Sequence, residues 1–248
     1  MAEISGVCAG LAGAAQPESE RKMKRLLAEE FPGKFVHVCT DLDLTLEATG
    51  SGPAIVLVAG TGSAAVGRGG DGQIARVGGH GPLLGDEGSA YDIGRRAAIG
   101  ALRESDRGIP NSPLAAKILR ELRVGDWQEF HLRVYSIPDE VFPRIFPVVA
   151  AAAEDGDPAA QELLQDASGA LARLVADLVE RLQLKAQKFL LVKSGGMVGR
   201  SGWLDRLTDE RLRIAAPHAE FGSLAMTAAE GAATMALRLI KALTNEEK

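Results

Sequence analysis

Cysteine, histidine and aromatic residues are scarce in this chain. Its 248 residues include two cysteines, four histidines and 4% aromatic residues. The histidines and cysteines show no spacing typical of zinc ligands, so the sequence identifies no metal site. Two cysteines fit a protein from a reducing compartment. Because Cys8 and Cys39 each lie in or beside an apolar run, we expect them to be buried structural thiols.

Long apolar runs and basic clusters are also missing. No run approaches the roughly 18 apolar residues of a membrane span, and the N-terminus lacks the basic start and apolar core of a signal peptide. Lys and Arg are spread along the chain, and the net charge of −5 argues against a nucleic-acid-binding surface. With 46% hydrophobic and 25% charged residues, the composition is globular. We therefore expect a cytoplasmic protein without membrane or nucleic-acid partners.

Glycine, in contrast, is abundant and marks the stretch on which the rest of the chain depends. Three short apolar runs alternate with two glycine-rich turns, at residues 54–58, 60–63, 64–66, 69–72 and 73–77. This alternation predicts a three-stranded meander. Glycines then surround His80, Asp86 and Glu87, and glycine at that density indicates unusual backbone angles or a ligand close to the backbone.

Residue spacing predicts the elements on both sides of the meander. Before it we expect strands at 4–8 and 35–39 and helices at 18–31 and 43–48. After it we expect strands at 188–192 and 213–215, and helices at 89–102, from 113 onward, and at 126–134, 138–146, 157–184, 203–208 and 223–243. This order predicts an α/β fold with a mixed sheet. Residues 1–50 resemble the end of a second copy of the pattern, without its opening meander.

Two glycine turns that follow predicted strands are candidate nucleotide contacts. The backbone N–H groups of residues 60–63 (Gly-Thr-Gly-Ser) would form a nest that suits phosphate; the alternative is a plain hairpin turn. Residues 194–197 (Ser-Gly-Gly-Met) would let an adenosine lie against the backbone; the alternative is a turn from strand to helix.

Three acidic residues and one histidine are candidates for chemistry on an acceptor. Asp41 follows a predicted strand, where a carboxylate can act as a general base; the alternative is a helix cap. Asp86 and Glu87 would bind sugar hydroxyls, or a metal through water, or complement the dipole of the next helix. His80 is equally a substrate contact or an ordinary loop residue.

Taken together, these segments resemble the BadF/BadG/BcrA/BcrD ATPase family and, within it, the N-acetylglucosamine kinases. The resemblance covers nearly the whole chain, and its most specific part is the order and spacing of the central motifs. The matching segments are residues 10–13 (GLAG), 40–41 (TD), 59–63 (AGTGS), 78–81 (GGHG), 85–89 (GDEGS) and 194–196 (SGG).

The resemblance implies an actin-like ATPase architecture of two RNase H-like lobes with ATP between them. It implies ATP and Mg²⁺ as cofactors and an amino sugar such as N-acetylglucosamine as substrate, with a homodimer as one option. Asp41 matches the catalytic base. The other matched positions are Gly60, Thr61, Gly62 and Ser63 for the ATP phosphates, Thr61, Gly62, Gly79, His80 and Asp86 for the sugar, and Gly195, Gly196 and Met197 for adenosine.

The chain departs from the family pattern at the sugar site and at the N-terminus. Ala12 and His80 stand where the mammalian kinases carry a serine and a tryptophan beside the sugar, so the identity of the sugar stays open. The Asp-Gly-Gly-type first phosphate loop has no counterpart. We therefore expect residues 1–50 to be the remainder of an N-terminal lobe whose opening strands are missing. Residues 51–248 would be the C-terminal lobe, with a helical insertion at about 103–187 and a closing helix.

Three functions remain in competition. Phosphoryl transfer depends on positioning and charge neutralisation around the γ-phosphate, and the first phosphate loop would supply much of both. Because this loop has no counterpart, we expect a fragment or truncated gene product with little or no kinase activity. Its full-length relative would be an active sugar kinase. The second function is an ATPase activator of the same family, which would use cysteine ligands for an iron–sulfur cluster. The third is a non-catalytic remnant that binds nucleotide or sugar.

Overall fold

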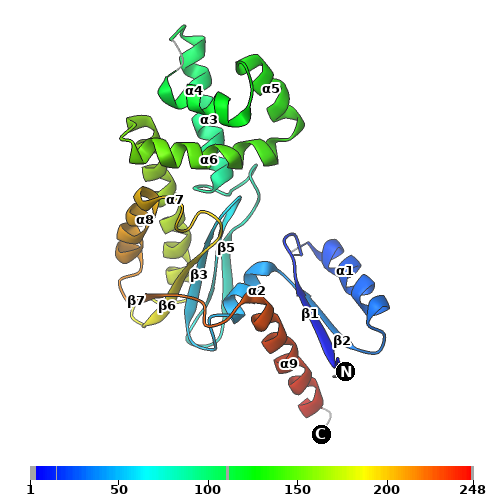
Figure 1. The fold of residues 1–248 in the computed structure, drawn as a ribbon. Helices are drawn as coiled ribbons and strands as arrows, with labels where there is room; N and C mark the ends of the chain where they lie inside the picture. Colours follow the sequence, from blue (N-terminus) through cyan, green and yellow to red (C-terminus); the bar gives the residue numbers. More distant parts are fainter. Residues whose placement is uncertain (1–3, 15, 110–111, 247–248) are drawn as a thin grey trace.

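The computed structural model describes residues 4–14, 16–109 and 112–246, which form two separate sheets (Figure 1). The smaller sheet pairs β1 (Gly6–Gly10) in parallel with β2 (Phe35–Cys39). The larger sheet has the strand order β5-β4-β3-β6-β7. Its strands are β3 (Ala54–Ala59), β4 (Ser63–Arg68), β5 (Ile74–Gly78), β6 (Phe189–Ser194) and β7 (Ala219–Gly222).

The larger sheet is mixed, and β3 lies at its centre. Strand β4 is antiparallel to β3 and β5, which confirms the predicted meander, whereas β6 runs parallel to β3 and β7. Side chains alternate between the two faces of a strand, and those of β3 are buried on both faces. Ile55 and Leu57 belong to the main core beneath the helices, and Ala54 and Val56 belong to a smaller cluster on the opposite face.

Helices cover the main core at one end of the larger sheet and along one of its faces (Figure 1). These helices are α3 (Ala90–Asp106), α4 (Pro113–Leu122), α5 (Trp127–Ser136), α6 (Pro138–Glu154), α7 (Pro158–Arg181) and α8 (Gly202–Ala215). Gly94 allows α3 and α6 to cross closely, because a Cβ there would lie 1.9 Å from the carbonyl oxygen of Phe142. Helix α7 then packs along β3, β4 and β5.

The smaller sheet is covered by α1 (Pro17–Glu30) and joined to the larger one by α2 (Asp41–Glu47) and α9 (Ala228–Glu246). On α2, Leu44 packs against Gly10 of β1, while Leu46 is buried in the smaller cluster of the larger sheet. Helix α9, which the predicted division assigns to residues 51–248, packs against α2, β1 and β2. The chain therefore returns to its N-terminal elements, and the boundary at residue 50 stays a prediction.

Three predicted elements need correction. Helix α6 continues to Glu154 through Pro143 and Pro147, whereas the sequence predicted an end at Phe146. The strand predicted at 213–215 is wrong, because these residues form the last turn of α8 and the strand follows as β7. The closing helix begins at Ala228 and not at Ser223.

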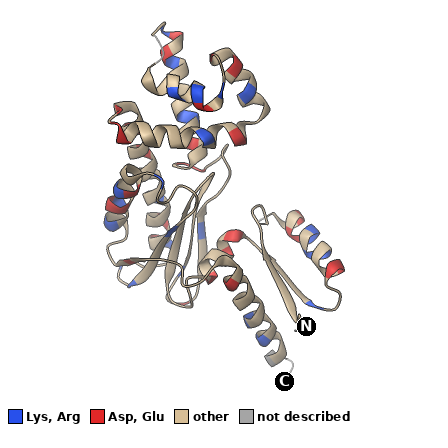
Figure 2. Ribbon diagram, in the orientation of Figure 1, with Lys and Arg blue, Asp and Glu red and all other residues tan. Residues whose placement is uncertain are grey.

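Charged residues of both signs are interspersed along the helices (Figure 2). Central strand β3 carries none, with the sequence AIVLVA. Within the described part of the chain, none of the helices combines the length and the apolar character that crossing a bilayer requires.

Candidate nucleotide and acceptor site

Two glycine loops meet at one edge of the larger sheet. They follow β3 and β6, which are parallel neighbours, so their carboxyl ends lie side by side. The N–H of Met197 donates to the carbonyl oxygen of Ala59 at 3.1 Å. A Cβ on Gly60 would lie 3.5 Å from the nitrogen of Gly196. The predicted phosphate loop and the predicted adenosine loop are therefore in contact.

Gly195 is the residue that permits this contact. Its φ of +105° lies in a region that favours glycine, and a Cβ there would lie 2.4 Å from the carbonyl oxygen of Ala59. No side chain fits between the two backbones. The glycine is thus required by the close approach of β3, and a contact of this loop with adenosine stays a prediction.

A cavity of about 480 Å³ opens where the two loops meet. Gly60, Thr61, Gly196 and Met197 line one side of it, and residues of α6 line the other. This volume is in the usual range for a small-molecule site. The residues of α6 and its surroundings that the sequence analysis missed are Pro143, Phe146, Pro147, Glu154 and Arg200.

The loop after β3 is fixed by hydrogen bonds to the start of α3. The carbonyl oxygens of Gly60 and Thr61 accept the N–H groups of Ala90 and Tyr91 at 2.9 and 3.3 Å. These are two of the donors that a helix N-terminus leaves without an intrahelical partner. The loop is therefore held in place by its carbonyl groups, and these two bonds do not use its own N–H groups.

Two of the four N–H groups in the loop are already used. Gly60 donates to the carbonyl oxygen of Gly62 at 2.9 Å, and Ser63 donates to Asp86 Oδ1 at 3.2 Å. Among the described residues, the N–H groups of Thr61 and Gly62 have no hydrogen-bond partner. Any phosphate nest in this loop is thus narrower than the sequence predicted and consists of these two donors.

Asp86 lies against the same loop. It is 8% exposed and adopts a positive φ of 60°. A Cβ on Gly62 would lie 2.8 Å from Asp86 Oδ2, so the carboxylate touches the loop backbone. Burial raises the pKa of Asp86 above its ordinary value, while the hydrogen bond from Ser63 opposes that shift. Such a buried carboxylate is suited to accept hydrogen bonds from a polar ligand.

Gly79 and His80 complete the predicted sugar contacts. The N–H of Gly79 donates to the carbonyl oxygen of Ser63 at 3.0 Å. His80 is exposed and close enough to Asp86 to influence its pKa. The structure therefore brings Gly62, Gly79, His80 and Asp86 together around the β3–β4 turn. Beside them, the side chains of Leu83 and Leu84 are largely exposed.

Asp41 is the first residue of α2, the helix that joins the smaller sheet to the larger one. The capping role belongs to Thr40, whose hydroxyl accepts the N–H of Asp43 at 3.2 Å. Asp41 stays exposed, and its Oδ1 accepts the N–H of Leu42 at 3.0 Å. It does not line the cavity beside the glycine loops.

Arg76 ties the start of α2 to the larger sheet. It donates a hydrogen bond to the hydroxyl of Thr40 and lies 3.5 Å from Asp43 Oδ1. Arg76 is on β5, three residues before Gly79, and three strand residues span roughly 10 Å. The helix that carries Asp41 is therefore attached to the strand that leads into the predicted sugar loop.

The protein ligands of a metal stay unassigned. Among the described residues, no group of three or more His, Cys, Asp or Glu side chains could hold a metal ion. Mg²⁺ in phosphoryl-transfer sites is usually bound through substrate phosphates with only one or two carboxylates.

Comparison with known proteins gives consistent results. A family model described as BadF/BadG/BcrA/BcrD ATPase family matches residues 1–236. The chain is 28% identical over 241 residues to an N-acetyl-D-glucosamine kinase of Dictyostelium discoideum, covering 94% of this chain and 76% of that protein. It is 29% identical over 238 residues to an N-acetylmuramic acid/N-acetylglucosamine kinase of Clostridium acetobutylicum, covering 94% of this chain and 78% of the relative.

A solved structure shows the same fold. It is the crystal structure of a Chromobacterium violaceum protein provisionally assigned as an N-acetylglucosamine kinase. The TM-score is 0.73 at 26% identity, with 95% of this chain and 78% of the other covered. This likeness agrees with the α/β fold and mixed sheet found here.

Proposed function

Because the chain belongs to the BadF/BadG/BcrA/BcrD ATPase family, we propose that it binds ATP and directs phosphoryl transfer to a hydroxyl of an amino sugar such as N-acetylglucosamine. The observation that carries the proposal is the contact between the glycine loops after β3 and β6, which line one cavity. The names of the relatives point in the same direction.

The nucleotide would occupy the cavity between the two loops. Its adenosine would lie against the backbone of Gly195, Gly196 and Met197, and its phosphates would accept the free N–H groups of Thr61 and Gly62. The N-terminus of α3 lies behind the loop after β3, because the first N–H groups of the helix donate to the carbonyl oxygens of that loop. The positive end of a helix dipole favours a negative ligand.

The acceptor would lie between Asp86 and Asp41. Asp86, buried against Gly62, would accept hydrogen bonds from sugar hydroxyls, with Gly79 and His80 beside it. Asp41 would accept the proton of the attacking hydroxyl as a general base. Approach of the two sheets, joined through Arg76 and α2, would exclude water from the transfer.

Nucleotide titration and ADP release test this proposal. We expect ATP with Mg²⁺ to bind. ADP release is then measured with N-acetylglucosamine, N-acetylmuramic acid, glucosamine and glucose as acceptors. Replacing Asp41 by Asn should lower any turnover by about 10²–10⁴-fold, the usual contribution of a general base, without weakening ATP binding. Asp177→Asn, on the exposed face of α7, is the matched control.

The same measurements separate the competing functions. Binding without sugar-dependent ADP release would favour a non-catalytic remnant and agree with the expected low activity, whereas robust turnover would refute that expectation. Failure to bind any nucleotide would refute the kinase proposal. The activator alternative is disfavoured because Cys8 and Cys39 both lie against Met235 of α9, which is a poor arrangement for the four cysteine ligands of an iron–sulfur cluster.

A further inference from the structure

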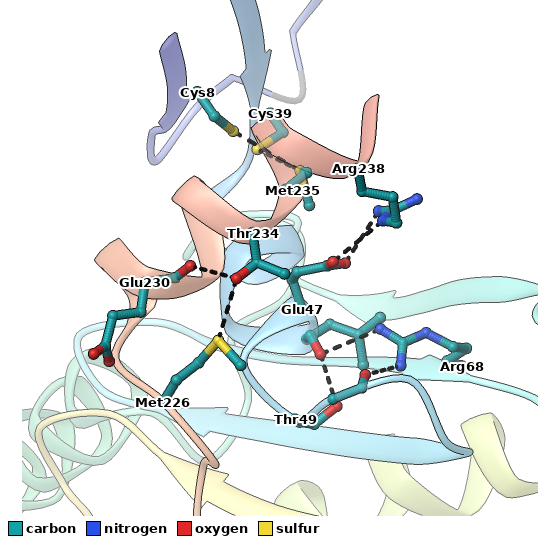
Figure 3. Close-up of polar contacts among 12 residues, drawn as sticks. Cys8, Cys39, Glu47, Thr49, Arg68, Met226, Glu230, Thr234, Met235 and Arg238 are labelled. Atoms are coloured by element: carbon teal, nitrogen blue, oxygen red, sulfur yellow. Dashed lines mark hydrogen bonds and ion pairs between the residues drawn. The ribbon is translucent and has the colours of Figure 1, made fainter. Parts of the chain in front are cut away.

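Three sulfur atoms, from β1, β2 and α9, meet where α9 packs against the smaller sheet (Figure 3). Cys8 of β1 and Cys39 of β2 each place Sγ at 3.9 Å from Sδ of Met235. The two thiols also interact with each other. Met235 is buried, and both cysteines are half-buried. We call these three residues the sulfur cluster.

The sequence of β1 explains why α9 approaches the sheet at this point. Gly6, Cys8 and Gly10 alternate along β1 and therefore share the face on which α9 packs. A Cβ on Gly6 would lie 2.7 Å from Cδ1 of Ile240 on α9, and a Cβ on Gly10 would lie 2.3 Å from Cδ1 of Leu44 on α2. The two glycines let both helices close on β1, and Cys8 is left between them.

The strand register does not favour a disulfide between the two cysteines. Cys8 pairs with His37, and Cys39 pairs with Gly10, so the cysteines are offset by two residues on neighbouring strands. Strands lie about 4.8 Å apart and rise about 3.3 Å per residue, which gives a Cα separation of roughly 8 Å. A disulfide requires about 7 Å or less. The thiols are thus close at their tips but not along their backbones.

The spacing of the sulfur atoms suits a shared cation. Sulfur ligands at the usual metal–thiolate bond length of about 2.3 Å around a trigonal cation lie about 4.0 Å from one another, and the two distances from Met235 Sδ, to Cys8 Sγ and to Cys39 Sγ, are both 3.9 Å. We propose that Cys8, Cys39 and Met235 form a binding site for a soft monovalent cation, Cu(I), with two thiolates and one thioether as ligands.

The ligand set selects this class of metal. Soft thiolate and thioether ligands favour Cu(I), whereas a structural zinc site needs four ligands, usually Cys and His. Among the described residues, no three His, Cys, Asp or Glu side chains form a metal-binding group, so the sulfur cluster offers zinc only two of its usual ligands. Binding of Cu(I) converts the two thiols to thiolates and releases two protons to solvent, with no change in oxidation state.

A path to the site is present in the fold. Cys39 and Met235 line a cavity of about 460 Å³ between the smaller sheet, α2 and α9. A cation could reach the sulfur cluster from there without unfolding of the sheet. Once bound, it would connect β1, β2 and α9, the three elements that otherwise meet through few buried side chains.

Competition for Cu(I) with bathocuproine disulfonate under anaerobic, reducing conditions tests the proposal on the full chain. We expect one Cu(I) per chain. Cys8→Ser and Cys39→Ser should each weaken binding by at least about 100-fold, because loss of an outer-sphere partner alone costs roughly 10–100-fold. Met235→Leu should weaken binding by roughly 10-fold or more. Met226→Leu is the matched control, since Met226 lies outside the cluster and contacts Thr234.

X-ray absorption of the copper-loaded wild-type chain provides a measurement that needs no variant. We expect three sulfur neighbours at about 2.3 Å. Two sulfur neighbours, with unchanged affinity in Met235→Leu, would overturn the assignment of the thioether. Loss of all copper to the chelator, or equal affinity in Cys8→Ser, Cys39→Ser and wild type, would overturn the site. Neither measurement depends on kinase activity.

Discussion

The two sheets of this protein differ sharply in how they are packed. The larger sheet is buried on both faces, and its central strand contributes to two separate clusters. The smaller sheet has one small cluster, in which only Ala14, Val36 and Val38 are buried, and α1 above it has no buried residue. The glycine loops that line the candidate nucleotide cavity belong to the larger sheet, whereas Asp41 follows the smaller one.

This difference places the parts of the proposed reaction on supports of unequal rigidity. The nucleotide loops are fixed by β3, β6 and α3. The proposed general base is positioned by α2. This helix contacts the larger sheet through Leu42 and Leu46, and through the side chains of Arg68 and Arg76. We therefore expect nucleotide binding to withstand changes in the smaller sheet, and acceptor chemistry to be sensitive to them.

The largest effect should come from breaking the loop contact in the larger sheet. In Gly195→Ala, the new Cβ would overlap the backbone of Ala59 and the residue would keep a positive φ. We expect the free energy of unfolding to fall by roughly 2–5 kcal/mol, as the sum of left-handed strain and overpacking, and ATP binding to be lost. Urea unfolding and nucleotide titration measure the two effects.

Gly199→Ala is the matched control for that substitution. Gly199 has a similar positive φ of 77°, but nothing lies within 4 Å of its added Cβ. It should cost only the backbone strain of about 1–2 kcal/mol. Equal losses of stability and ATP affinity in the two variants would contradict the importance of the contact between the loops.

A smaller effect is expected from breaking the connection between the sheets. Leu46 is 1% exposed and packs with Val56 and Val66. Leu46→Ala should lower the free energy of unfolding by about 2–4 kcal/mol, within the range for buried leucine and limited by the small size of the cluster. Hydrogen exchange should show more lost protection in β1, β2 and α9 than in β3. The control is Leu26→Ala on α1, which is 45% exposed and should change little.

The sequence predicted the glycine-bounded elements and the long helix α7 well, whereas it placed an end of α6, α8 and α9 wrongly. Glycine turns at both ends fixed β3 and β4 to within a few residues, because few other conformations accommodate such spacing. Helix α6 was predicted too short because Pro143 and Pro147 usually end a helix. Its buried stripe of Val141, Ile145 and Val149 continues across both prolines, and tertiary packing decides the outcome.

The errors near the C-terminus have local explanations. The pattern Thr227-Ala-Ala-Glu230 is a capping box, with Glu230 accepting the N–H of Thr227 at 2.8 Å, and it would have indicated the start of α9. Arg213 was read as part of a strand, although the buried residues Leu204, Thr208 and Leu212 follow helical spacing. Its guanidinium lies over the ring of Phe221 in β7.

The site was only partly predictable for a different reason. Motif spacing identified the residues around the β3–β4 turn, because they follow strands whose ends meet. It could not identify Phe146 as a cavity residue, since its contribution depends on how α6 packs across α3. It also did not identify Arg200, which lies three residues after Met197 in the loop that follows β6. It also could not show that Gly60 and Ser63 already use their N–H groups.

A still smaller effect, which depends on pH, is expected from Asp86, the buried carboxylate beside the β3–β4 turn of the larger sheet. Burial raises the pKa of Asp86 in the folded state above its ordinary value of 3.8, so the folded protein binds the proton more tightly than the unfolded chain does. The contribution of Asp86 to the free energy of unfolding should therefore increase as the pH falls through the raised pKa. The same contribution should be lost as the pH rises through that pKa toward neutral.

Asp86→Asn isolates this contribution, because an amide oxygen can still accept the N–H of Ser63 but does not titrate. The stability of wild type relative to Asp86→Asn should rise between pH 7 and pH 4 in urea unfolding experiments. A constant difference across that range would mean that the carboxyl is not perturbed by burial.

The smallest effect concerns the ion pair between α9 and α2. Arg238 contacts both carboxylate oxygens of Glu47, at 3.3 and 3.1 Å (Figure 3). Arg238 is 59% exposed and Glu47 is 14% exposed, so solvent screens part of the attraction. Arg238→Gln should lower the free energy of unfolding by about 0.5–1 kcal/mol, the upper part of the range for surface pairs.

Lys188→Gln provides the reference for that measurement, because Lys188 and Glu220 are 83% and 66% exposed and their pairing belongs to the larger sheet. It should change stability by less than about 0.5 kcal/mol. If the two substitutions had equal effects, the ion pair would not hold α9 on α2. The attachment of α9 to α2 would then depend on packing, and the residue to replace next would be Gly231, where a Cβ would lie 2.9 Å from the carbonyl oxygen of Leu44.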